Sequence, residues 1–122
     1  MSSLSINGKL ISNTDLVIDG AEVKTGMTFE GKPVYAKRFG ITLSSDTTPK
    51  TYAHGIADIS YIIDIRGYAT TSSPEFYPVQ WYNGGAYFAV HTDRTNIILR
   101  TSLSGLYGRG AVITLYYTKT TD

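Results

Sequence analysis

Residues 59–66 alternate between two sets of side chains, and this alternation limits the folds open to the chain more than any other stretch does. One set consists of large apolar side chains: Ile59, Tyr61, Ile63 and Ile65. A period of two is that of a β-strand with one apolar face. The run is rich in β-branched and aromatic residues, and glycines near both ends of segment 54–68 allow the backbone to turn there. We therefore predict a central core strand within residues 54–68.

The composition favours an all-β protein with a single core. A chain of 122 residues suits one domain and is too short for two ordinary ones. Ten Tyr and twelve Gly, with few long helix formers, are typical of sheets and tight turns. Because Tyr and Trp supply much of the 42% hydrophobic share and carry polar atoms, we expect a modest core.

Further strand signals recur at intervals of ~8–12 residues, separated by Gly, Asn, Asp and Pro. The expected strands are 22–29, 32–43, 77–82, 86–91, 96–101 and 111–118. We expect Asn83-Gly84-Gly85 to close a tight hairpin between 77–82 and 86–91, and residues 102–110 to form a Gly-rich loop. Within 32–43, the residues Tyr35, Phe39, Ile41 and Leu43 share one parity. No helical periodicity of useful length is present. The series predicts an all-β, jelly-roll-like antiparallel β-sandwich.

The first 21 residues have low apolar content and are set apart from this series. The dipeptide Asn7-Gly8 between short apolar segments predicts a small hairpin within residues 4–18, and turn formers follow at 13–15 and 19–20. We therefore divide the chain into an N-terminal arm or linker hairpin, residues 1–21, and a β-sandwich domain, residues 22–122.

Charge and hydropathy argue against several classes of partner. Eleven Lys and Arg are spread among ten Asp and Glu, a net charge of +1, which gives no basic stripe for nucleic-acid phosphates. No window approaches the ~18 consecutive apolar residues that span a bilayer, and no signal peptide is recognisable at the N-terminus. Cysteine is absent, so neither disulfides nor a Cys-based zinc site is available. We expect neither nucleic-acid binding nor membrane insertion.

Three segments in a fixed order carry a resemblance to a known family: GKPVY at 31–35, HGIADI at 54–59 and VITLYYTKTTD at 112–122. Over residues 22–122 the chain resembles the C-terminal β-sandwich domains of bacteriophage tail-fibre and receptor-binding proteins. The resemblance implies a trimer at the distal end of a virion appendage that binds cell-surface glycans or proteins without catalysis. Strands with two partly apolar faces are compatible with such an oligomer.

The leading hypothesis is thus a non-enzymatic, homotrimeric receptor-binding or fibre-tip domain that recognises a host cell-surface glycan. Such a protein is made in the host cytoplasm and works in the virion, with residues 1–21 contacting other virion proteins. The alternative is a structural virion module without a ligand of its own: a trimerisation or attachment cap, a baseplate adaptor or a capsid decoration protein. A stand-alone cellular lectin of sandwich fold is a third possibility.

Aromatic and polar residues in the second half are the best candidates for glycan contact, because sugar C–H faces stack on aromatic rings and polar side chains reach the hydroxyls. The group comprises Tyr77, Trp81, Tyr82, Asn83, Tyr87, Asp93, Arg94, Tyr107 and Arg109. Seven of them form the predicted site: Trp81, Tyr82, Asn83, Asp93, Arg94, Tyr107 and Arg109. The competing interpretation is that Trp81 and about half of the tyrosines are core or subunit-interface residues.

Catalytic, metal and cofactor sites are not predicted. Asp58 and Asp64 are six residues apart on one extended segment, hence ~20 Å apart, too far for a glycosidase pair. His54 and His91 lack the spacing of a metal pair, and His54 is better explained as a hydrogen-bonded structural histidine. The run GLYGRG at 105–110 lacks the Lys-Ser/Thr and following helix of a phosphate loop.

Overall fold

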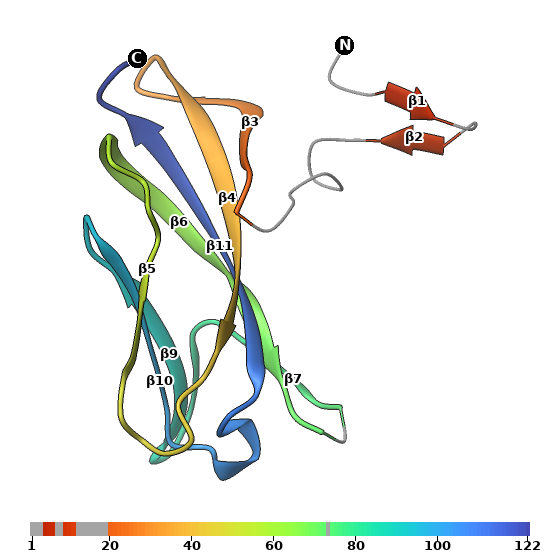
Figure 1. Cartoon of the computed structure of the whole chain (residues 1–122), viewed down its shortest axis with the longest axis vertical. Coiled ribbons are helices and arrows are strands. Elements are labelled where there is room, and N and C mark those ends of the chain that lie inside the picture. The colour runs from red at the N-terminus through yellow and green to blue at the C-terminus, as the bar shows by residue number, and fades with distance from the viewer. Residues whose placement is uncertain (1–3, 7–8, 12–19, 73) are drawn as a thin grey trace. The chain divides into compact units, whose positions relative to one another are not determined.

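The computed structural model describes residues 4–6, 9–11, 20–72 and 74–122, whose strands form three sheets (Figure 1). A two-stranded sheet pairs β1 (Leu4–Ile6) with β2 (Lys9–Ile11). A four-stranded sheet follows the order β5 (Lys50–Ala53), β10 (Asn96–Thr101), β9 (Ala86–Thr92), β8 (Trp81–Asn83). A five-stranded sheet follows the order β3 (Glu22–Phe29), β4 (Lys32–Thr42), β11 (Gly110–Lys119), β6 (Ile59–Thr70), β7 (Phe76–Pro78). The described residues also include a 3-10 turn, η1 (Ser104–Leu106).

The chain is an all-β protein in which two antiparallel sheets pack as a sandwich, and this confirms the predicted fold class. The strand order is jelly-roll-like, because β4, β5 and β6 alternate between the sheets and β10 and β11 return beside β5 and β4. The alternation is interrupted by the β6–β7 hairpin and by the β8–β9–β10 meander, each of which stays within one sheet.

The described chain divides into two compact units. Unit 1 holds the described part of Met1–Arg38 with Asp58–Asp64 and Leu115–Asp122, and unit 2 holds Phe39–Ala57 and Ile65–Thr114. The strands β4, β6 and β11 contribute residues to both units, whereas the whole four-stranded sheet belongs to unit 2.

Unit 2 contains the two-layered core of the sandwich. Its core side chains are each 3% exposed or less: Phe39, Ile41, Leu43, Ala69, Phe88, Val90, Ile97, Leu99, Leu106, Ala111 and Ile113. The rings of Phe39 on β4 and Tyr52 on β5 meet edge-to-face at 5.8 Å and so join the two sheets. Leu106 is fully buried from the η1 turn, which shows that the predicted Gly-rich loop 102–110 also contributes to the core.

Unit 1 is built on parts of the five-stranded sheet. Val34, Tyr35, Ala36, Ile59, Leu115 and Tyr117 are buried there. The rings of Tyr35 and Tyr117 stack at 6.1 Å, and Phe29 meets Tyr61 edge-to-face at 5.9 Å. In unit 1, therefore, aromatic rings pack against one another, whereas the core of unit 2 lies between two sheets.

The strand predicted within 54–68 exists, but the prediction of its core face is wrong. Strand β6 runs from Ile59 to Thr70, and β11, not β6, is the central strand of its sheet. Ile59 is buried, whereas Tyr61 is 58% and Ile63 is 37% exposed. The physical reason is that alternation identifies the apolar side of a strand, whereas burial requires a second layer over that side, which the alternation does not supply.

The predicted strand 77–82 is also wrong as a single element. The chain forms β7 up to Pro78 and β8 from Trp81, and these two strands belong to different sheets. Gln80, between them, bonds its side chain to the backbone of Val90 instead of joining a ladder. Strand β5, four residues long at a sheet edge, was not predicted, because so short a segment shows no clear period.

Other local predictions are confirmed. Strand β8 pairs with β9 in the register Asn83↔Ala86, as expected for the Asn83-Gly84-Gly85 turn. Strand β1 pairs with β2 in the register Ile6↔Lys9, as expected for a hairpin in this segment. Residues 12–19, which include the predicted turn at 13–15, lie outside the described residues.

Candidate functional site

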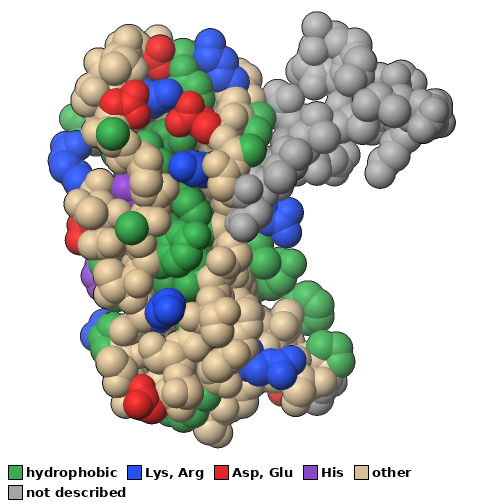
Figure 2. Space-filling model, viewed as in Figure 1, with side chains coloured by type: hydrophobic (Ala, Val, Ile, Leu, Met, Phe, Trp, Pro, Cys, Tyr) green, Lys and Arg blue, Asp and Glu red, His purple; other side chains and the backbone are tan. Residues whose placement is uncertain are grey.

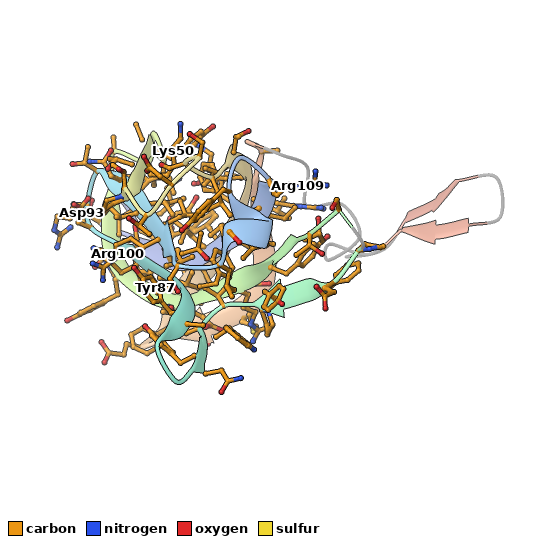
Figure 3. The ribbon with its side chains drawn as sticks, turned by 90° about the horizontal axis from the view of Figure 1, so that it is seen from below. Lys50, Tyr87, Asp93, Arg100 and Arg109 are labelled. Carbon is orange, nitrogen blue, oxygen red and sulfur yellow. The ribbon has the colours of Figure 1, made fainter. Side chains whose placement is uncertain are left out.

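The predicted seven-residue site is divided between opposite ends of unit 2. Asp93 and Arg94 occupy the β9–β10 turn, whereas Asn83 lies at the β8–β9 turn. Strand β9 separates these two turns by seven residues, which is ~20 Å at the rise of a strand. Figure 3 likewise places Arg109 apart from Asp93. The seven residues therefore do not form one contact surface.

Trp81 takes part in packing. It is opposite the fully buried Phe88 in the β8–β9 register, so it points to the inner side of the sheet. Its ring meets that of Tyr77 on β7 edge-to-face at 5.0 Å. The pair thus connects the two sheets at their β7 and β8 edges, which is the packing role weighed for Trp81 above.

Asp93 has a structural task in its turn. Its Oδ1 accepts hydrogen bonds from the backbone N–H of Asn96 at 2.7 Å and of Thr95 at 2.8 Å. These bonds, the one from Asn96 first, hold the pKa of the Asp93 carboxyl below its usual value. A carboxylate that caps its own turn has less capacity for an external hydroxyl.

Arg94, the other predicted site residue of this turn, lines a neighbouring hollow of ~500 Å³. The full lining is Ala53, His54, Gly55, Ile56, Ala57, Arg94 and Thr95. His54 is 2% exposed: its Nδ1 accepts the Ile56 N–H at 3.1 Å, and its Nε2 lies 3.0 Å from the Asp93 carbonyl oxygen. Both ring nitrogens are therefore used by the backbone, as expected for a structural histidine.

The loop with Tyr107 and Arg109 is tied to the segment after β4. The Gly108 N–H donates to the Ser44 carbonyl at 3.0 Å, and the Leu43 N–H donates to the Arg109 carbonyl at 2.8 Å. Tyr107 is half-buried and the Arg109 side chain is exposed. These backbone bonds hold the Arg109 main chain, so its side chain projects from a fixed position at this end of unit 2.

The outer face of the four-stranded sheet brings together a better contact surface. Tyr82 is 66% exposed and lies opposite Tyr87 in register, with ring centroids 6.4 Å apart and planes inclined by 30°. Arg100 pairs with Ala89, two residues along β9 from Tyr87, so it is exposed on the same face. Figure 3 shows Tyr87 and Arg100 on the same side of the unit. Two tyrosine rings and a guanidinium thus share this face, which we call the tyrosine face.

Sequence reasoning included both tyrosines of this face but missed Arg100. The alternation in 96–101, with buried Ile97 and Leu99, was a usable signal, because it places Arg100 on the outer side of the strand. What the sequence could not supply was the register between β9 and β10 that sets Arg100 diagonally from Tyr87.

A charged cluster fills one side of unit 1. Lys119 Nζ lies 2.8 Å from Glu22 Oε1, 3.6 Å from Asp58 Oδ2 and 4.7 Å above the ring of Tyr35. The Tyr117 hydroxyl donates to Glu22, and burial together with this hydrogen bond raises the pKa of Tyr117. Because each charge has an opposite charge or an aromatic ring beside it, the cluster links the C-terminal strand β11 to β3.

In the described part of the chain, no three or more His, Cys, Asp or Glu side chains lie together so that they could hold a metal ion. No helix of the described residues is long and apolar enough to cross a membrane. On the face shown in Figure 2, Lys and Arg side chains are scattered among polar and apolar ones.

Comparison with known proteins gives no relative for this chain: no family model, curated protein or solved structure matches it significantly.

Proposed function

We propose that the chain is a non-enzymatic receptor-binding or fibre-tip module of a bacteriophage, which recognises a glycan on the host cell surface. The observation that carries the glycan-binding part is the tyrosine face: exposed Tyr82 beside Tyr87, with Arg100 near them, on a sheet whose inner side is the packed core. Aromatic faces bind apolar sugar C–H groups, and a guanidinium donates to hydroxyl or carboxylate oxygens. A rigid sheet holds these groups at little entropic cost on binding.

The assignment to a phage appendage rests on the resemblance of residues 22–122 to tail-fibre and receptor-binding domains. In this proposal the protein is a homotrimer in the virion. Exposed apolar side chains in unit 1 support an oligomer, since Met27 is 52%, Tyr61 58% and Ile63 37% exposed. Residues 1–21 would contact other virion proteins.

Binding to a glycan array and to host envelope preparations tests the proposal. We expect Tyr82→Ala to weaken binding about 10-fold, the effect of losing ~1.4 kcal/mol of ring contact. The matched control is Tyr82→Phe, which keeps the ring and removes only the hydroxyl, and it should bind within about threefold of the wild type. Absence of binding by the folded wild-type protein to every glycan and envelope component would refute the proposal.

The same exposed side chains of unit 1 favour a second candidate function, a structural virion module. Such a module would use Met27, Tyr61 and Ile63 as subunit or partner contacts and would need no ligand. A mass measurement in solution separates this from the first candidate when combined with the array. A trimer without any glycan binding favours the structural module.

A further inference from the structure

A shallow hollow of ~470 Å³ lies on the outer face of the five-stranded sheet in unit 2, and its lining includes none of the seven residues of the predicted site. It is lined by nine residues from four adjacent strands: Gly40, Ile41, Thr42, Tyr68, Thr70, Phe76, Gly110, Ala111 and Val112. Ile41 and Ala111 are buried toward the core, so at these positions the backbone forms the floor. The volume falls in the range of small-molecule sites, ~300–1,000 Å³.

Two exposed aromatic rings form one wall of the hollow. Tyr68 on β6 is 36% exposed and Phe76 on β7 is 65% exposed, and their ring centroids are 5.5 Å apart with planes inclined by 50°. Phe76 pairs with Thr70 in the β6–β7 register, so a threonine is its direct cross-strand neighbour. Exposure of a phenylalanine to this extent costs burial energy that a ligand would recover.

Glycines keep the opposite side of the hollow open. Gly110 at the start of β11 is exposed, and a Cβ added there would meet nothing within 4 Å. Gly40 is exposed near the C-terminal end of the neighbouring strand β4. A glycine within a strand weakens the strand and often marks a place where a ligand approaches the backbone.

The chemistry of the lining selects the ligand. None of the nine described lining residues is charged, so neither an anionic nor a cationic ligand finds a counter-charge in the hollow. The rings offer apolar stacking surfaces, while Thr42, Thr70 and Tyr68 carry hydroxyls. A neutral pyranose, with apolar C–H faces and a rim of hydroxyls, has the complementary chemistry.

A second copy of this chain fits the hollow less well. Stable protein interfaces bury ~800 Å² on each partner and use about 20–30 residues a side, whereas nine residues line this hollow. We therefore propose that the hollow at Tyr68 and Phe76 is a binding subsite for a neutral pyranose ring, separate from the tyrosine face. This inference rests on the proposed glycan-binding function and gives it a second contact point.

The test uses the full chain and uncharged monosaccharides as probes: the methyl glycosides of glucose, galactose, mannose and N-acetylglucosamine. Binding is followed by the NMR signals of the Tyr68 and Phe76 rings, with N-acetylneuraminic acid and glucosamine as charged comparators. At least one neutral glycoside should shift these signals saturably, and the charged comparators should bind more weakly. Phe76→Ala should weaken that binding about 10-fold.

Gly110→Phe fills the hollow from its open side and should also reduce the affinity about 10-fold, monitored through the Phe76 signals. The matched control is Gly85→Phe, which adds the same ring at the β8–β9 turn, where an added Cβ likewise meets nothing within 4 Å. It should leave binding at the hollow within about twofold. Circular dichroism confirms that both variants are folded.

The outcomes separate the two proposals. If the wild type binds a glycan and Tyr82→Ala weakens binding while Gly110→Phe has no effect, the proposed function stands and the second subsite is refuted. If no glycan binds at all, both fail. If no probe shifts the ring signals and Gly110→Phe instead breaks a concentration-dependent oligomer in sedimentation, the hollow is a subunit contact and the inference is overturned.

Discussion

Gly67 offers the sharpest test of the strand arrangement in unit 2. It lies within β6, has φ of +150°, and its carbonyl accepts the Val79 N–H at 3.1 Å. A Cβ built at this position would lie 2.0 Å from the Val112 carbonyl oxygen and 3.0 Å from the Ile113 Cα on β11. We therefore expect Gly67→Ala to be strongly destabilising.

The magnitude follows from three contributions. Carbon and oxygen approach to about 3.3 Å at closest in β-sheets, so β6 and β11 must separate locally by about 1.3 Å. A non-glycine residue at this φ costs roughly 1–2 kcal/mol, overpacking adds about 1–3 kcal/mol, and each lost ladder bond adds about 1 kcal/mol. The sum is ~3–6 kcal/mol, a large part of the ~5–15 kcal/mol that holds a typical domain folded.

Urea denaturation measures this effect, and Trp81 is a suitable reporter because it is the single tryptophan and packs on Tyr77 in the same unit. With a slope of ~1–3 kcal/mol per M, the midpoint should fall by roughly 1 M or more. The control is Gly110→Ala, where the added Cβ meets nothing within 4 Å, and it should remain within about 0.5 kcal/mol of the wild type. A Gly67→Ala protein as stable as that control would refute the close β6–β11 approach described here.

Three further predictions concern buried or hydrogen-bonded polar groups. His54→Ala should lower the free energy of unfolding by ~2–5 kcal/mol in urea denaturation, because two backbone groups lose their hydrogen-bond partner. The control is His91→Ala at an exposed position, which should stay within about 0.5 kcal/mol of the wild type. Equal effects of the two substitutions would contradict the buried role of His54. The folded state lowers the pKa of Asp93, so its contribution to stability is present above the ordinary carboxyl pKa of ~3.9 and is lost as pH falls through the lowered value. Asp93→Ala should therefore have a shallower loss of stability below pH ~4, and an unchanged acid limb would argue against the cap. The folded state raises the pKa of Tyr117, so the contribution of Tyr117 to stability is present below the ordinary tyrosine pKa of ~10 and is lost as pH rises above it. The stability of Tyr117→Phe should therefore depend less on pH than that of the wild type between roughly pH 9 and 11, the range around that pKa. A pH series of thermal melts checks this.

Local signals were enough wherever an element depends on its own residues. The shared parity of Tyr35, Phe39, Ile41 and Leu43 predicted a buried face, and all four are 9% exposed or less. The Asn83-Gly84-Gly85 turn predicted the β8–β9 pairing because turn residues fix hairpin register. These features form from neighbouring residues, so a sequence contains nearly all the information for them.

Features that depend on distant layers were not predictable in this way. Tyr61 and Ile63 have the pattern of a core face, yet they are exposed, because alternation identifies the apolar side of a strand and does not determine whether another sheet covers it. The segment 77–82 has the composition of one strand, yet the chain passes from one sheet to the other within it.

The candidate sites show the same division. The sequence by itself determined the all-β class, the turns, and the supply of aromatic and polar side chains for binding. Only the tertiary structure decided which of them meet: it directs Trp81 inward onto Tyr77, engages Asp93 in its own turn, and sets Tyr68 beside Phe76 through the β6–β7 register. The reason is that a ligand surface is made by side chains from different strands, and their proximity depends on sheet order and register, which single-strand periodicity does not encode.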